Sequence, residues 1–541
     1  MNKYRDLCAP SHAPELRFDL LDLDYAARLN AVREVLESAR ERGWGERTAY
    51  YCGGRERCFA DVHRDVHRRA HALRAAGVGI GDCVVLRLPD DYELVVLLLA
   101  VQAIGAVAMP TFVQLRADDL SYRISDADAR FVITSEALLD EVEKTPQRRD
   151  AALQILVTDT GATPYRALSA LMPDGDVKPE YADTDAEQVC LLLYTSGSTG
   201  APKGTCHCHR DMLAIADTYW RHCVAPGPDD IVAGPPSIAF AMGFGLSVYF
   251  PLRLGHAAVL EPDKSPERAL EMIERHGVTI FVGVVSYFNA MARLIDATRA
   301  NLGSLRLVLT GGEPLTDEAA RRWTEVTGTT LEQFIGTTEM LHIFVTSSRP
   351  GAAADSSTLG RSVPGYDVAV LDPNTFTPVP DGTPGLLSVR GPTGTVYWRK
   401  PDHQAATVVG GWNVFQDLVT RDAHGCFHYI ARFDEVIVSS GYNISPVQVE
   451  SVLLRHPAVL ECACVPAPDP TGDRSAVVKA FVVPSASVTA DDALVAELQD
   501  FVKTHAPPYM YPRVVAFEPE LPKTITGKIQ RGQLRARENF S

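Results

Sequence analysis

The feature of this sequence that most constrains its fold is a repeated alternation of short β-branched runs with longer stretches of helical pattern. Strands that alternate with helices usually form parallel sheets covered by helices, so we expect a layered α/β body. Ligands of such bodies bind at the carboxyl ends of the strands. The expected strands are residues 83–88, 130–134, 154–158, 257–260, 279–282 and 305–309, and the expected helices are residues 94–103 and 266–276.

The pattern changes twice towards the C-terminus. From about residue 359, Gly and Pro crowd between short apolar runs, which indicates an all-β, barrel-like subregion. After Arg432 the chain has the pattern of a compact α+β domain, with helices at residues 446–454 and 491–505 and strands at 459–465, 477–483 and 514–518. We therefore expect a large N-terminal domain over residues 1–432 and a small C-terminal domain over residues 433–541.

The charge balance limits the partners of the chain. Lys and Arg number 52 against 68 Asp and Glu, a net charge of −16, and a field of this sign repels nucleic acids and anionic membranes. Eleven scattered cysteines are typical of reduced thiols, and the N-terminus lacks a signal-peptide pattern. The longest apolar run, residues 94–109, is shorter than the ~20 residues that cross a bilayer. These observations predict a cytoplasmic protein.

A glycine-rich segment over residues 194–204 is the most informative stretch. Small hydroxyl residues and glycines allow backbone N–H groups to face inward and cradle phosphate oxygens, and Lys203 can add a positive charge. The spacing differs from the GxxxxGK[ST] loop of P-loop NTPases. The segment follows the apolar run 189–193, so we expect it at the end of a strand. Its predicted phosphate-binding residues are Thr195, Ser196, Gly197, Ser198, Thr199, Gly200 and Lys203.

This segment resembles the phosphate loop of the acyl-adenylate-forming superfamily, which includes acyl-CoA synthetases, adenylation domains and beetle luciferases. Further motifs match in order: Gly311-Gly-Glu-Pro-Leu315, Phe334-Ile-Gly-Thr-Thr-Glu339, Asp417, Arg432-Phe-Asp434 and Pro522-Lys-Thr-Ile-Thr-Gly-Lys528. The resemblance spans roughly residues 24–535. It implies a large body of layered sheets with a small, mobile C-terminal domain.

The resemblance implies a two-step reaction. A carboxylate attacks the α-phosphorus of ATP to give an acyl-adenylate and pyrophosphate, and a thiol, here coenzyme A, then displaces AMP. Joining two anions requires positive charge at the transition state, and Lys528 would bridge the carboxylate and the α-phosphate. Thr338 would donate its hydroxyl to the α-phosphate, and Glu339 would hold Mg²⁺.

The same resemblance assigns the remaining ATP contacts. Gly312, Glu313 and Pro314 form the turn that faces adenine, and Ile335, Gly336 and Thr337 continue the adenine wall. Asp417 would accept both ribose hydroxyls, with Arg432 donating from the opposite side. Ile335 departs from the family because many relatives carry tyrosine there, and an isoleucine offers adenine no ring for stacking.

For the second step the small domain must turn about the position matched by Asp434. Ser440 and Gly441 would then face the pantetheine of CoA, and Arg474 is a candidate for a CoA phosphate.

The expected acyl site lies around Phe240, Phe244, Gly336 and His342. These residues most resemble the benzoate-CoA and 2-aminobenzoate-CoA ligases. Aromatic rings around a short slot fit a planar aryl acid, and a polar neighbour such as His342 would help to select an ortho-amino group. The leading hypothesis is therefore an aryl-CoA ligase, with 2-aminobenzoate favoured and benzoate next.

Two alternatives remain. The enzyme could load the aryl group onto the phosphopantetheine of a carrier protein, because both thiols are chemically alike. Thirteen residues follow Lys528, so we expect any carrier to act in trans. A non-catalytic acid sensor is disfavoured by the presence of Lys528, Glu339 and Asp417. The sequence leaves open whether the protein is a monomer or a homodimer.

Overall fold

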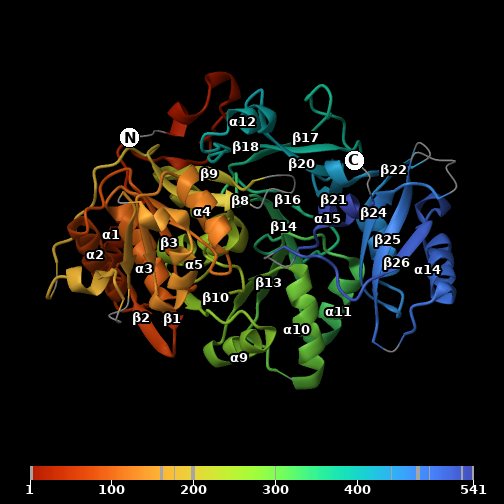
Figure 1. The fold of residues 1–541 in the computed structure, drawn as a ribbon, viewed down its shortest axis with the longest axis horizontal. Helices are drawn as coiled ribbons and strands as arrows, with labels where there is room; N and C mark the ends of the chain where they lie inside the picture. The colour runs from red at the N-terminus through yellow and green to blue at the C-terminus, as the bar shows by residue number, and fades with distance from the viewer. Residues whose placement is uncertain are drawn as a thin grey trace.

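The computed structural model describes residues 4–150, 152–158, 163–175, 177–195, 201–298, 300–439, 442–470, 476–486, 488–524 and 528–538. Two large sheets with their helices make up most of the chain, and the C-terminal strands β24–β26 with helix α14 lie at the far right of Figure 1. A smaller antiparallel sheet lies above and between them in this view.

The first large sheet has seven strands in the order β7-β6-β5-β3-β4-β8-β9. All neighbouring pairs are parallel except β8 and β9, which form an antiparallel pair. Helix α3 is buried on almost every side, as expected for a helix whose residues are nearly all apolar. The strands are β3 (Cys83–Arg87), β4 (Val107–Pro110), β5 (Phe131–Thr134), β6 (Gln154–Val157), β7 (Arg166–Ala167), β8 (Val189–Thr195) and β9 (Lys203–Cys208). The helices are α1 (Ala31–Glu41), α2 (Phe59–Ala75), α3 (Tyr92–Ala103), α4 (Ala117–Asp126), α5 (Leu139–Glu143) and α6 (His209–Ile215).

The second large sheet has nine strands in the order β16-β15-β14-β13-β12-β10-β11-β1-β2. Six central strands are parallel, and antiparallel strands close both edges. The strands are β1 (Thr48–Cys52), β2 (Arg55–Cys58), β10 (Ile231–Ala233), β11 (Ala257–Leu260), β12 (Ile280–Gly283), β13 (Leu307–Gly311), β14 (Leu331–Gly336), β15 (Ile343–Thr346) and β16 (Arg361–Ser362). The helices are α7 (Ala241–Phe244), α8 (Phe250–Leu254), α9 (Pro266–His276), α10 (Val285–Thr298) and α11 (Asp317–Thr327), with π-helical segments η7 (Ala216–Val224) and η8 (Gly245–Tyr249).

The antiparallel sheet and the C-terminal part complete the chain. The sheet contains β17 (Asp367–Leu371), β18 (Gly385–Arg390), β19 (Val408–Val409), β20 (Trp412–Arg421) and β21 (Phe427–Arg432), with α12 (Pro401–Thr407) beside β19. The C-terminal part has its own apolar clusters, built from residues beyond 436. Its elements are β22 (Ile437–Ser439), β23 (Tyr442–Ile444), α13 (Pro446–Leu453), β24 (Val459–Ala467), β25 (Val477–Pro484), α14 (Asp492–His505), β26 (Val514–Phe517) and α15 (Arg531–Arg537).

The structure confirms the predicted fold class: parallel sheets with helices, a barrel-like antiparallel region and a C-terminal α+β part. Within the part of the chain that the structure describes, no helix is both long and apolar enough to cross a membrane.

Candidate functional site

The predicted adenine turn and the Thr338 turn follow two adjacent parallel strands. β13 ends at Gly311 and pairs with β14, so the segments that follow both strands emerge at one edge of the sheet. Gly311 allows close approach, because a methyl group there would lie 2.2 Å from the Phe334 ring. Gly312 has φ +77°, a left-handed conformation that favours glycine.

The turn after β14 is held tightly. The Thr337 hydroxyl accepts a hydrogen bond from the Met340 N–H at 3.2 Å, and the Thr338 carbonyl accepts from the Leu341 N–H at 3.0 Å. Leu341 has φ +64°, a rare conformation for a large side chain, and such strain tends to cluster at functional sites. Gly336 must be small, because a Cβ there would lie 2.5 Å from the His342 carbonyl oxygen.

Glu313 has a role that its motif did not predict. Both of its carboxylate oxygens accept hydrogen bonds from Ser286 near the start of α10, one from the backbone N–H at 2.8 Å and one from the hydroxyl at 3.1 Å. Pro314 follows in the same turn. The glutamate therefore fixes the Gly312 turn to α10.

Lys528 approaches this turn from the C-terminal part of the chain. A methyl group on Gly312 would lie 3.6 Å from Lys528 Nζ. Two hydrogen bonds link Lys528 to Thr524: the Thr524 N–H donates to the Lys528 carbonyl at 2.7 Å, and the Lys528 N–H donates to the Thr524 hydroxyl at 3.1 Å. Lys528 is exposed in part, but the protein around it removes water from the ammonium group and so lowers its pKa. The carboxylates of Glu313 and Asp417 oppose this shift.

Asp417 and Arg432 lie opposite each other on β20 and β21. Burial raises the pKa of Asp417, and the positive charges of Arg432 and Lys528 oppose this rise. Arg432 Nε also donates to Asp434 Oδ1 at 3.2 Å. The structure thus brings the charged groups of Lys528, Asp417, Arg432 and Glu313 close together.

Glu339 is held by a residue that the sequence reasoning missed. The Tyr397 hydroxyl donates to Glu339 Oε1 at 2.8 Å, and Lys203 Nζ lies 5.3 Å from the centre of the Tyr397 ring. Tyr397 reaches this place because Thr205, on β9, bridges to it. A lone tyrosine has no motif signal, so only this pairing reveals its role.

Only the ends of the predicted phosphate loop can be placed. Thr195 ends β8 and pairs in register with Lys203, the first residue of β9. The prediction that the segment follows a strand is therefore confirmed. Several predicted site residues lie outside the described residues: Ser196, Gly197, Ser198, Thr199, Gly200, Ser440, Gly441 and Arg474.

The predicted acyl residues lie in two packed groups. Phe240 is partly exposed and its ring centre lies 5.4 Å from that of Phe112, whereas Phe244 is fully buried and lies 5.5 Å from Tyr249. The loop before Phe240 is fixed by Asp90, which accepts from the Ser237 hydroxyl and the Ile238 N–H, both at 2.9 Å. Ile335 is partly buried and packs against the main apolar cluster.

His342 is a buried, neutral imidazole. Its ring centre lies 4.5 Å from that of Phe250, and a Cβ on Gly245 would lie 2.5 Å from the ring. Neither ring nitrogen makes a well-formed hydrogen bond among the residues that the structure describes, although the Met242 backbone lies close enough to act on the ring. Burial lowers the pKa of His342 to about 3. The ring can therefore offer a hydrogen bond to a polar group that enters beside it.

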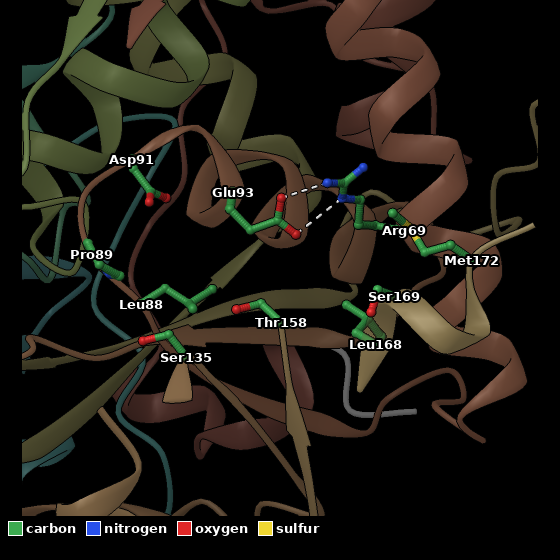
Figure 2. Close-up of a pocket in the computed structure, with 10 residues that line it drawn as sticks. All are labelled: Arg69, Leu88, Pro89, Asp91, Glu93, Ser135, Thr158, Leu168, Ser169 and Met172. Atoms are coloured by element: carbon green, nitrogen blue, oxygen red, sulfur yellow. Dashed lines mark hydrogen bonds and ion pairs between the residues drawn. The ribbon is translucent and has the colours of Figure 1, made fainter. Parts of the chain in front are cut away.

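A separate cavity of about 360 Å³ opens where β3, β5 and β6 end, and none of the predicted site residues lines it. Figure 2 shows the Arg69 guanidinium paired with both oxygens of Glu93, at 3.2 and 2.6 Å, beside Ser135, Thr158 and Leu168.

Three comparisons relate the chain to known proteins. Residues 37–398 match the family described as AMP-binding enzyme, and residues 448–528 match the AMP-binding enzyme C-terminal domain. The benzoate–CoA ligase of Thauera aromatica is 34% identical over 516 residues, covering 94% of this chain and 96% of that protein. The p-hydroxybenzoic acid–AMP ligase FadD22 of Mycobacterium tuberculosis is 32% identical over 514 residues, covering 94% of this chain and 68% of that protein. The crystal structure of the anthranilate CoA ligase AuaEII with anthranoyl-AMP has a TM-score of 0.89 at 30% identity, covering 96% of this chain and 99% of that one.

Proposed function

We propose, from the premise that this chain belongs to the AMP-binding enzyme family, that it activates 2-aminobenzoate with ATP and transfers the aryl group to CoA. At the coarser level it is an AMP-forming acid–CoA ligase that acts on aryl acids. ATP and CoA are accordingly its substrates.

The observation that carries the proposal is the position of Lys528. A cation from the C-terminal part of the chain lies at the Gly312 turn, next to Asp417 and Arg432. This is the edge of the sheet at which an α/β body binds its ligands. A positive charge there would stabilise the charge that develops when a carboxylate attacks the α-phosphorus of ATP.

The other predicted groups would position the nucleotide. Asp417 and Arg432, on neighbouring strands, suit the ribose hydroxyls, and the Thr338 hydroxyl suits the α-phosphate. Thr195 and Lys203 frame the phosphate loop. Glu313 and Pro314 would position the adenine through the turn fixed to α10.

Glu339 fits a magnesium site. The carboxylate is partly exposed, and Tyr397 binds only its Oε1, so Oε2 can face a hard cation. Bound there, Mg²⁺ would neutralise phosphate charge. Tyr397 would orient Glu339 for that role.

For the aryl acid, we place the ring near Phe240, Phe244 and Gly336. His342 would then supply the specificity. A neutral imidazole nitrogen accepts a hydrogen bond from an aniline N–H, and benzoate has no such donor.

The second step requires access for a thiol. We propose that the domain over residues 433–541 turns against the domain over residues 1–432, with Asp434 as the hinge. Ser440, Gly441 and Arg474 would then contact CoA. Turnover is proposed to take place in the cytoplasm.

One comparison favours a second candidate. FadD22 is named as an acid–AMP ligase, and this chain covers about two thirds of it. Because that name contains no CoA, we keep loading of a carrier protein in trans as the alternative fate of the adenylate.

A pyrophosphate-release screen over aryl and alkyl acids, run with and without CoA, tests the proposal. We expect the highest kcat/KM with 2-aminobenzoate, and faster turnover when CoA is present. A clear preference for benzoate would overturn the substrate assignment, and release that CoA leaves unchanged would favour the carrier alternative.

A further inference from the structure

A cluster of potential metal ligands lies on helices α1 and α2, outside the proposed adenylation site. His63 and His67 are four residues apart on α2, so they share one face of that helix. Glu37 faces them from α1, with its Oε1 lying 3.1 Å from His63 Nε2. Tyr181, from the segment before β8, donates to the same Oε1 at 2.9 Å and lies 3.0 Å from His67 Nε2.

The ligand atoms converge on one point. One oxygen of Glu37 and one ring nitrogen each of His63 and His67 all lie within 4.8 Å of one another. Two imidazole nitrogens and a carboxylate oxygen form a ligand set that suits zinc and its neighbours in the first transition row. The fourth position of a tetrahedral site can be taken by the Tyr181 hydroxyl or by water.

A further contact orients Glu37 for this site. Arg40 Nε donates to Glu37 Oε2 at 2.9 Å, so one oxygen is fixed by the arginine while the other faces the histidines. His67 is buried, but Glu37 and His63 each expose 21% of the side chain, so an ion can enter.

We propose that Glu37, His63 and His67 bind a divalent transition-metal ion of the zinc class, which ties α1 to α2. When no ion is bound, these side chains hydrogen-bond to one another and to Tyr181. We therefore expect metal binding to be reversible. Without the ion, His63 Nε2 contacts Glu37 and His67 Nε2 contacts Tyr181. When the ion binds, both nitrogens exchange these contacts for bonds to the metal. No residue proposed for catalysis takes part, so the ion acts on stability and not on the reaction.

The test uses the full-length protein after treatment with a chelator. Zn²⁺ should raise the melting temperature and bind at a stoichiometry of one, and Co²⁺ in its place should give the visible absorption of a tetrahedral site. Mg²⁺, which prefers oxygen ligands, should do neither. His63→Ala and His67→Ala should each weaken binding at least about tenfold.

His71→Ala is the matched control, because His71 lies one further turn along α2 and is exposed. It should bind zinc like the unchanged protein. His63→Ala is the safer variant because His63 is partly exposed, so the test stands even if His67→Ala does not fold. Zinc binding that survives both substitutions, or that His71→Ala abolishes, would overturn the proposal. Pyrophosphate release by metal-free His63→Ala should equal that of the unchanged protein. The metal site and the proposed function are thus tested independently of each other.

Discussion

Lys528 is the residue on which the proposed first step depends most. Replacing it with alanine removes the cation at the Gly312 turn, so we expect adenylate formation to fall by about a hundredfold or more. Thioester formation from supplied aryl-AMP should change little, because that step does not need the bridging charge. The two half-reactions can be measured by pyrophosphate release and by thioester yield.

Lys523 supplies the control for that experiment. It is five residues earlier and exposed, with its ammonium group 2.8 Å from Glu461. Lys523→Ala should leave adenylation almost unchanged, because exposed ion pairs contribute little. An equal loss of both half-reactions in Lys528→Ala would contradict the assigned role.

His342 gives a prediction about specificity. Replacement by leucine removes both ring nitrogens, so the preference for 2-aminobenzoate over benzoate should fall about tenfold, the value of one neutral hydrogen bond. Burial lowers the pKa of His342 to about 3, so its ring is neutral throughout the range from about pH 6 to 9. The preference of the unchanged enzyme should therefore stay constant from about pH 6 to 9. The ratio of kcat/KM values for the two acids checks both points, and a titration of the preference near pH 6 would count against them.

The sequence could identify those residues that belong to long motifs and missed those that act alone. Lys528 and Glu313 come from strings of several residues, and the structure places them close together. Tyr397 and Asp90 are single polar residues whose roles depend on distant pairing, through β9 and through the loop before Phe240. No local pattern encodes such contacts.

At the scale of elements, α15 follows Lys528 and is tied to α13 through Arg531. Arg531 donates to Glu450 through two bonds, Nε to Oε1 at 3.1 Å and Nη2 to Oε2 at 2.7 Å, and Glu450 is buried. Arg531→Met leaves that carboxylate buried without its cationic partner, although the Cys464 N–H still donates to Glu450 Oε1. We expect the free energy of unfolding of the C-terminal part to fall by about 3 kcal/mol, measured by urea denaturation.

Arg537→Met, on the same helix, is the comparison variant. Its ion pair with Glu518 at 3.1 Å is largely exposed and should contribute less than about 1 kcal/mol. Equal destabilisation by the two substitutions would show that burial of Glu450 is not the cause.

The six strands expected by range in the two large sheets lie within two residues of β3, β5, β6, β11, β12 and β13, because continuous apolar β-branched runs signal buried parallel strands. Helices α1 and α2 were not predicted, since their narrow apolar stripes lie among many charged residues. Strand β14, with the sequence LEQFIG, mixes polar and apolar residues, and only its place between β13 and β15 makes it a strand. The π-helical turns of η7 and η8 follow no 3.6-residue period.

At the scale of the whole molecule, the proposed function requires the C-terminal domain to turn. Asp434→Pro fixes one backbone angle at the proposed hinge, so thioester formation should slow much more than adenylation. Asp434→Ala is the control: it removes the ion pair with Arg432, which is too exposed to matter greatly, and leaves the backbone free. Rapid-quench measurement of both half-reactions decides the matter, and equal slowing in the proline variant would exclude Asp434 as the hinge.

The contact between Gly245 and His342 has a consequence for substrate range. The imidazole is close-packed between a helical backbone and Phe250, and close-packed interiors do not yield to extra volume without a cost of about 1–3 kcal/mol. In the acyl site that we propose, this wall cannot retreat. Across a series of benzoates whose ring substituents cannot donate a hydrogen bond to His342, reactivity should therefore fall as the substituent next to this wall becomes bulkier. Electron-withdrawing or electron-donating character should matter less, and a Hammett plot of kcat/KM should scatter where a steric plot is linear.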